Sequence, residues 1–134
     1  MDSSVRLIRS AALSDAPYAY GAVVEDGMRL VFLAGACPLE PDGTTAAVGD
    51  YVGQAAKCIQ NLTEALRAAG ATLRDVVSTR VLVASAQRSD LGAVWDVVHD
   101  AFGDHDAPST LLGVTVLGYE DQLVEIEAVA AISG

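Results

Sequence analysis

The run 123–132 constrains the fold more than any other segment, because it is strongly apolar and yet carries two carboxylates two residues apart. Alternate side chains of a β-strand point to opposite faces, so Glu125 and Glu127 share one face while Val124 and Ile126 share the other. The pattern therefore predicts a strand with one apolar and one polar face.

Two interpretations of this acidic face are open. Strands with one solvated face routinely show the alternation, and solvation alone would explain both carboxylates. A functional carboxylate would instead lie at the mouth of an apolar site, where it can take part in proton transfer. The alternation alone does not distinguish a solvated face from a functional carboxylate.

A chain of 134 residues without repeat, linker or low-complexity segment predicts a single domain over residues 1–134. Strand-like runs at 17–25 and 28–36 flank the pair Asp26-Gly27. Such a pair supplies the positive φ angles of a tight turn, so a β-hairpin is predicted here.

Two helices are predicted from apolar periodicity and terminal residues. The first follows an N-cap at Asp50 and ends at Gly70, and the second runs from about Asp90 to Gly103. The β-branched segment 75–84 between them predicts a strand.

The runs 109–117 and 123–132, joined by the polar turn 118–121, are predicted to close the chain as a second hairpin. Strands with only two helices indicate an α+β fold, a mixed sheet with both helices on one face. An apolar face left uncovered predicts assembly. The residues expected on that face are Val81, Val83, Val114 and Val116.

Charge and segment composition limit the partners. The chain has 8 Lys plus Arg against 18 Asp plus Glu, a net charge of −10, which argues against binding nucleic acid and anionic membranes. Residues Met1–Arg6 lack the features of a signal peptide, and no segment approaches the roughly 20 apolar residues of a membrane span. A cytoplasmic protein is expected.

Neither a metal nor a cofactor is predicted. His99 and His105 have no Cys or acidic ligand at suitable spacing. Cys37 and Cys58 lie far apart and are expected to be free thiols. Cys58 falls on a helical core pattern, whereas Cys37, at a strand end, is either a small hydrophobe or a reactive thiol.

Several segments occur in an order and spacing typical of one family: Ala16-Pro17-Tyr18, Phe32-Leu33-Ala34-Gly35-Ala36-Cys37-Pro38, Gln54 with Asn61-Leu62 and Leu66-Arg67-Ala68-Ala69-Gly70, Asp75-Val76-Val77, Pro108-Ser109-Thr110-Leu111-Leu112-Gly113-Val114, and Val124-Glu125-Ile126-Glu127-Ala128. Together they resemble the Rid (YjgF-like) family of imine and enamine deaminases, over nearly the whole chain. The resemblance implies a chorismate-mutase-like α+β subunit. It also implies a homotrimer whose sheets form a central barrel, with a small-molecule ligand bound in clefts between subunits.

The resemblance also implies roles for individual residues. Glu125 matches the acidic residue that positions or activates the hydrolytic water, whereas Glu127 is a structural or solvated carboxylate. The residues implied in ligand binding are Tyr18, Ala34, Gly35, Ala36, Cys37, Trp95, Ser109 and Thr110. Alternatives remain for three of them: Tyr18 as a structural aromatic, Gly35 as a strand-end bend and Trp95 as a core anchor.

The chain departs from the deaminating members at the position where an arginine grips the substrate carboxylate, which is Ser109 here. Losing a charged hydrogen bond costs roughly 1.5–3 kcal/mol, so activity on 2-imino acids is in doubt unless another arginine replaces it. The candidates are Arg29, Arg80 and Arg88. Ala34-Gly35-Ala36 in place of Ser-Gly-Gln, and Trp95 in place of a common Asn, predict a more apolar cleft.

The sequence leaves three functions open. The first is hydrolysis of a small imine or enamine to a carbonyl compound plus ammonia, with Glu125 managing the water. The second is a non-catalytic trimeric protein that binds a small imine, enamine or carbonyl compound. The third, endoribonuclease, appears in the naming of the family and is disfavoured by the acidic charge.

Overall fold

The computed structural model describes residues 5–134, so most of the N-terminal segment Met1–Arg6 lies outside the described residues. The elements in chain order are β1 (Val5–Ile8), β2 (Gly21–Val24), β3 (Met28–Phe32), α1 (Tyr51–Ala68), the 3-10 turn Leu73–Asp75, β4 (Val76–Val83), α2 (Arg88–Phe102), β5 (Ser109–Gly113) and β6 (Val124–Ser133).

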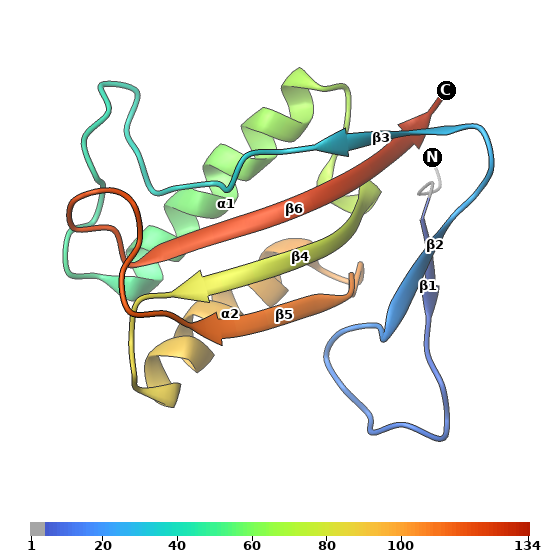
Figure 1. Cartoon of the computed structure of the whole chain (residues 1–134), viewed down its shortest axis with the longest axis horizontal. Helices are drawn as coiled ribbons and strands as arrows, with labels where there is room; N and C mark the ends of the chain where they lie inside the picture. Colours follow the sequence, from blue (N-terminus) through green and yellow to red (C-terminus); the bar gives the residue numbers. More distant parts are fainter. Residues whose placement is uncertain (1–4) are drawn as a thin grey trace.

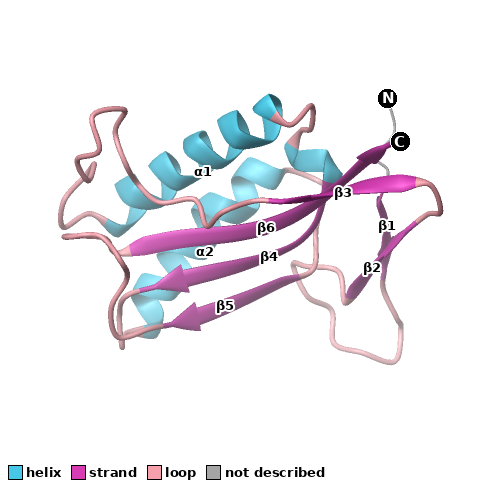
Figure 2. Ribbon diagram, turned by 45° about the horizontal axis from the view of Figure 1, so that its top comes forward, coloured by secondary structure: helices cyan, strands magenta, loops and turns pink. Residues whose placement is uncertain are grey.

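Four strands form the main sheet in the order β3-β6-β4-β5. The central strand β6 runs antiparallel to β3 and to β4, whereas β4 and β5 are parallel. Both helices cover one face of this sheet, and β1 and β2 form a separate two-stranded ribbon at one end (Figures 1 and 2). The predicted α+β class, with a mixed sheet and two helices on one face, is confirmed.

Both predicted hairpins are wrong. Gly27 does turn the chain, with φ 83°, but β2 pairs with β1, and β3 pairs with β6. At the other end, β5 pairs with β4 and not with β6. In the second case the reason is that β3 and β4 already occupy both edges of β6, so no edge is left for β5. In the first case β3 pairs with the long strand β6, and β2 pairs with β1 in a separate ribbon.

The helix predictions are confirmed at their ends. Asp50 caps α1, since its Oδ1 accepts a hydrogen bond from the Gly53 N–H at 3.0 Å. Gly70 and Gly103 follow the two helices with φ 81° and 62°, a region that glycine adopts readily. Helix α2 begins at Arg88, two residues before the predicted start.

The N-cap permits a prediction about stability. Replacing Asp50 with alanine leaves the first-turn N–H groups of α1 without their side-chain acceptor, and we expect a loss of about 1 kcal/mol in the free energy of unfolding. Urea unfolding at constant protein concentration measures it. Asp96→Ala, an equal change of charge on the exposed side of α2, is the control and should shift stability by less than about 0.5 kcal/mol. Equal effects of the two substitutions would contradict the capping role.

The prediction for the open sheet face is wrong in detail. Val81 and Val83 are fully buried in the core beneath the helices, because β4 turns its odd-numbered residues from 79 onward toward them. The residues on the opposite face that stay exposed are Leu30 (51%), Phe32 (75%) and Leu112 (37%). Val116, 77% exposed, lies beyond the end of β5. The open face nevertheless carries exposed apolar side chains.

Candidate functional site

The acidic face of β6 has the predicted alternation. Val124 and Ile126 are fully buried beneath the helices, and Glu125 and Glu127 lie half-buried on the open face. Glu127 forms an ion pair with Arg80 on β4 (3.2 Å). The two carboxylates therefore differ, because only Glu127 has a cationic partner among residues 5–134.

Glu125 is held at one oxygen. Its Oε1 accepts hydrogen bonds from the Cys37 thiol (3.4 Å) and from the Gln122 side-chain amide (3.1 Å). Within residues 5–134 no hydrogen bond reaches Oε2. That oxygen lies directly over Gly35, where an added Cβ would be 2.2 Å from it. Because Gly35 has no side chain, the carboxylate of Glu125 can occupy this space.

Cys37 is a protonated donor at neutral pH. Burial, the hydrogen bond to Glu125 and the charge of that carboxylate together raise the pKa of its thiol to about 11. The reactive-thiol interpretation is therefore disfavoured, since the thiolate is the nucleophile. Cys58 is free and fully buried in the core, and burial raises its pKa also.

Tyr18, Trp95 and Ser109 come together in a second place, near the N-terminal end of β5. The rings of Tyr18 and Trp95 meet edge-to-face with centroids 6.3 Å apart, and Trp95 stacks on His99 at 5.9 Å. A cleft of about 400 Å³ opens there, within the size range of ligand sites. Its lining consists of Pro17, Tyr18, Trp95, Ser109, Thr110 and Leu111.

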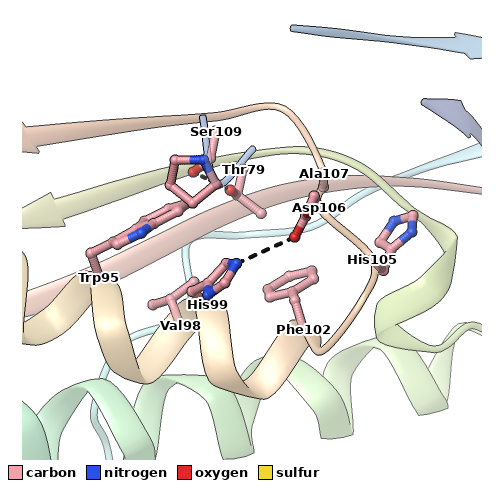
Figure 3. A pocket seen from close by; sticks show the side chains of 10 residues that line it. Thr79, Trp95, Val98, His99, Phe102, His105, Asp106, Ala107 and Ser109 are labelled. Carbon is pink, nitrogen blue, oxygen red and sulfur yellow. Dashed lines mark hydrogen bonds and ion pairs between the residues drawn. The ribbon is translucent and has the colours of Figure 1, made fainter. Parts of the chain in front are cut away.

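A smaller pocket shares Pro17, Trp95 and Ser109 with this cleft and is also lined by His99 and Phe102 (Figure 3). It has room for about 10 Å³, no more than a water molecule. Trp95 borders both spaces, so it lines the cleft and also packs against the core. The two interpretations of Trp95 from the sequence, a cleft-lining residue and a core anchor, therefore both describe part of its surroundings.

Arg9 and Asp106 hold the segment that carries Tyr18, and no sequence pattern indicates this contact. Arg9 donates to the carbonyl oxygens of Ala16 (2.9 Å) and Tyr18 (3.0 Å), and to Asp106 Oδ2 (2.7 Å). The other carboxylate oxygen of Asp106 lies 3.3 Å from His99 Nε2 (Figure 3). One carboxylate thus joins the Tyr18 segment to helix α2.

The cleft is not cationic. Of the described residues that line it, none is a lysine or arginine. The hydroxyl of Ser109 accepts a hydrogen bond from Thr79 Oγ1 at 2.7 Å, so it can offer a ligand one neutral O–H donor and no charge. Of the arginines considered as replacements, Arg80 pairs with Glu127, and Arg29 donates weakly to the Ser133 carbonyl (3.4 Å).

One subunit does not bring all the predicted residues together. In the strand register, Glu125 lies two strands across and three residues along from Ser109, about 14 Å by strand geometry and on the opposite sheet face. Gly35 and Cys37 lie next to Glu125. Ala34, which precedes Gly35, is exposed. Ala36 packs against the core and pairs with Ile126.

Residues 5–134 contain no group of three or more His, Cys, Asp or Glu side chains arranged to hold a metal ion. Among the same residues, neither helix is long and apolar enough to cross a bilayer.

Comparison with known proteins identifies the class. The family model described as Endoribonuclease L-PSP matches residues 9–132. The mouse 2-iminobutanoate/2-iminopropanoate deaminase is 30% identical over 133 residues, which cover 97% of this chain and 94% of that protein. A Rid-family structure, YyfB from Yersinia pestis, is 28% identical with a TM-score of 0.90, covering 96% of this chain and 99% of that one. Escherichia coli TdcF, solved with bound serine, is 27% identical with a TM-score of 0.67, covering 96% and 99%.

The fold is thus that of a Rid-type subunit, with a carboxylate on the open sheet face and an aromatic cleft at one edge. The chain belongs to the Rid (YjgF-like) family, whose family model carries the description Endoribonuclease L-PSP.

Proposed function

We propose that this protein hydrolyses a small imine or enamine to a carbonyl compound plus ammonia, in clefts between the subunits of a cytoplasmic homotrimer. The deaminase name of the mouse relative, at 30% identity, supports the reaction class. The observation that carries the proposal is the state of Glu125: one oxygen is tied by two donors, and the other is open above Gly35.

The proposed chemistry needs only this chain's residues and water. Oε2 of Glu125 accepts a proton as water adds to the C=N carbon, and the proton is returned to the nitrogen. The hydroxyl proton of the resulting carbinolamine then passes to its nitrogen as the C–N bond breaks, which releases ammonia and leaves the C=O bond. An enamine enters the same route after protonation at carbon gives its imine.

The separation of the two groups of residues supports the proposed homotrimer. Glu125 with Gly35, and Ser109 with Tyr18 and Trp95, lie about 14 Å apart by strand geometry within one subunit. A neighbouring subunit on the open sheet face would bring one group against the other. It would also cover the apolar side chains of Leu30, Phe32 and Leu112, which are otherwise left in water.

The ligand is proposed to have little carboxylate character. Its cleft has two aromatic side chains and no cation among the described lining residues, and Ser109 offers one neutral hydroxyl that is already bonded to Thr79. A carboxylate placed there would lose its hydration without gaining a charged partner. An apolar imine, or a carbonyl compound with a hydrophobic body, fits better.

A second function is favoured by the same neutral cleft. A trimeric protein that binds a small carbonyl, imine or enamine compound without turning it over would keep the aromatic cleft and have no need of a substrate-gripping arginine. Endoribonuclease activity remains disfavoured by the net charge of −10. Highly purified protein is expected to leave RNA intact even in low salt, where electrostatic binding is strongest.

Glu125→Gln distinguishes the enzyme from the binding protein. We expect turnover of imines to fall by roughly 100-fold or more, because the amide cannot accept the proton, while the trimer persists. Ammonia release measures turnover and sedimentation measures assembly. Glu127→Gln is the matched control, with the same chemical change on the same strand face, and should stay within about threefold of the wild type. Ligand binding without turnover in the wild type would favour the binding protein.

A further inference from the structure

Gln122 is buried, with 4% of the residue's surface exposed, and both amide N–H donors and the amide oxygen of its side chain are hydrogen-bonded. Its Oε1 accepts from the Tyr119 N–H at 3.0 Å. Its Nε2 donates to the Val124 carbonyl and to Glu125 Oε1, each at 3.1 Å. A reversed amide would set its oxygen against both of these acceptors, so Gln122 presents only a donor to Glu125.

The turn that carries Gln122 is fixed from the core. Asp121, just before it, has φ 62°, in the left-handed region that residues other than glycine seldom adopt. Gln54 of α1 is fully buried and holds the turn on both sides. Its Nε2 donates to the Asp121 carbonyl (2.9 Å) and its Oε1 accepts from the Leu123 N–H (2.7 Å). Gln122 therefore has little freedom to move away from Glu125.

Cys37 approaches the same oxygen from the neighbouring segment after β3. Its thiol lies 3.4 Å from Glu125 Oε1. Asn61 of α1 anchors this segment, since its amide donates to the carbonyl oxygens of Cys37 and Leu39, both at 2.9 Å. Both donors to Glu125 are thus held by buried or half-buried amides of α1, while Oε2 is left above Gly35.

We propose that Gln122 and Cys37 are positioning residues that hold Oε1 of Glu125 and thereby make Oε2 the oxygen that meets the hydrolytic water. This inference rests on the proposed function. A carboxylate that is bonded at one oxygen cannot rotate to exchange its two oxygens without breaking both bonds. The reacting oxygen is therefore already aimed before a ligand arrives.

The contact between Cys37 and Glu125 is tested without any substrate. Removing the Glu125 charge lowers the pKa of the Cys37 thiol from about 11, so more thiolate is present near neutral pH. In Glu125→Gln we expect alkylation of Cys37 by iodoacetamide at about pH 8 to be roughly tenfold faster, because one pKa unit changes the thiolate fraction tenfold. Intact mass measures the reaction. In Cys37→Ser only Cys58 can react, so this variant measures the background alkylation of Cys58. Glu127→Gln is the charge control and should leave the alkylation rate of Cys37 unchanged.

The positioning role is tested by kinetics of the intact trimer on the imine that the wild type hydrolyses fastest. Gln122→Met and Cys37→Ala each remove a donor, and we expect kcat to fall roughly tenfold with KM within about twofold. Cys37→Ser keeps a donor and should keep most of kcat. If Gln122→Met fails to assemble, the serine and alanine variants at position 37 decide alone, because that side chain is small and only half-buried.

The outcomes separate the inference from the proposed function. Equal kcat for Cys37→Ser and Cys37→Ala, or equal alkylation rates for Glu125→Gln and the wild type, would overturn the positioning role while hydrolysis stands. A wild type that turns over no imine would overturn the proposed hydrolysis, and with it the role, even if the alkylation rates confirm the contact.

Discussion

Replacing Gly35 with alanine is expected to reduce imine turnover by roughly 100-fold while the protein stays folded, because an angstrom of displacement at a reacting group can cost that much. The added Cβ would be 2.2 Å from Oε2 of Glu125 and 2.8 Å from its carboxyl carbon, so the two groups cannot coexist. The obstructing atoms are the end of a flexible side chain. The carboxylate therefore swings aside and loses its bonds to Cys37 and Gln122, and the backbone need not move.

Turnover and stability measured together distinguish this displacement from misfolding. We expect the free energy of unfolding of Gly35→Ala to change by less than about 1 kcal/mol. Gly92→Ala, in α2, is the control, because a Cβ there meets no atom within 4 Å. It should leave turnover unchanged and slightly stabilise the helix. Full turnover in Gly35→Ala would show that the position of Glu125 above this glycine is irrelevant to the reaction.

Phe32→Asp is expected to convert the proposed trimer into monomers. Phe32 is 75% exposed in the isolated subunit and lies on the open sheet face, so the subunit itself loses little packing when the ring is removed. Assembly would enclose the new carboxylate in an apolar interface without a partner, at a cost of several kcal/mol per subunit. Turnover should disappear with the trimer, because the proposed cleft needs residues from two subunits.

Sedimentation velocity over a range of protein concentrations measures this change. The matched control is Leu13→Asp, which adds the same charge at a 50% exposed leucine outside the main sheet. It should sediment as the wild type does. A monomeric wild type, or a Phe32→Asp variant that remains trimeric and active, would contradict an assembly through the open face.

The alternation around Glu125 could be predicted from sequence because it is local. A strand of period two places Glu125 opposite Ile126 whatever its neighbours are, and the cap at Asp50 needs only the next few residues. Strand pairing could not be predicted in the same way, because it is not local. Asp26-Gly27 correctly indicates a turn, yet β3 pairs with the long apolar strand β6, about a hundred residues further along.

The support of the site could not be predicted, because it depends on contacts between distant segments. Gln122 follows a polar turn, and nothing in the sequence indicates that its amide is buried and bonded to Glu125. Arg9 likewise lies ninety-seven residues from its partner Asp106. The error about Val81 and Val83 has a related cause: alternation defines two faces of β4 but not which face receives the helices.

The most direct test is the hydrolysis of two sets of freshly generated imines, one with an adjacent carboxylate and one without, with semicarbazide trapping whatever imine escapes. The wild type, Ser109→Arg and Glu125→Gln are compared. We expect the wild type to hydrolyse imines that lack the carboxylate, Ser109→Arg to gain those that have it, and Glu125→Gln to hydrolyse neither set. Wild-type turnover that survives in Glu125→Gln, or no turnover of either set by the wild type, would contradict a hydrolase that acts through Glu125.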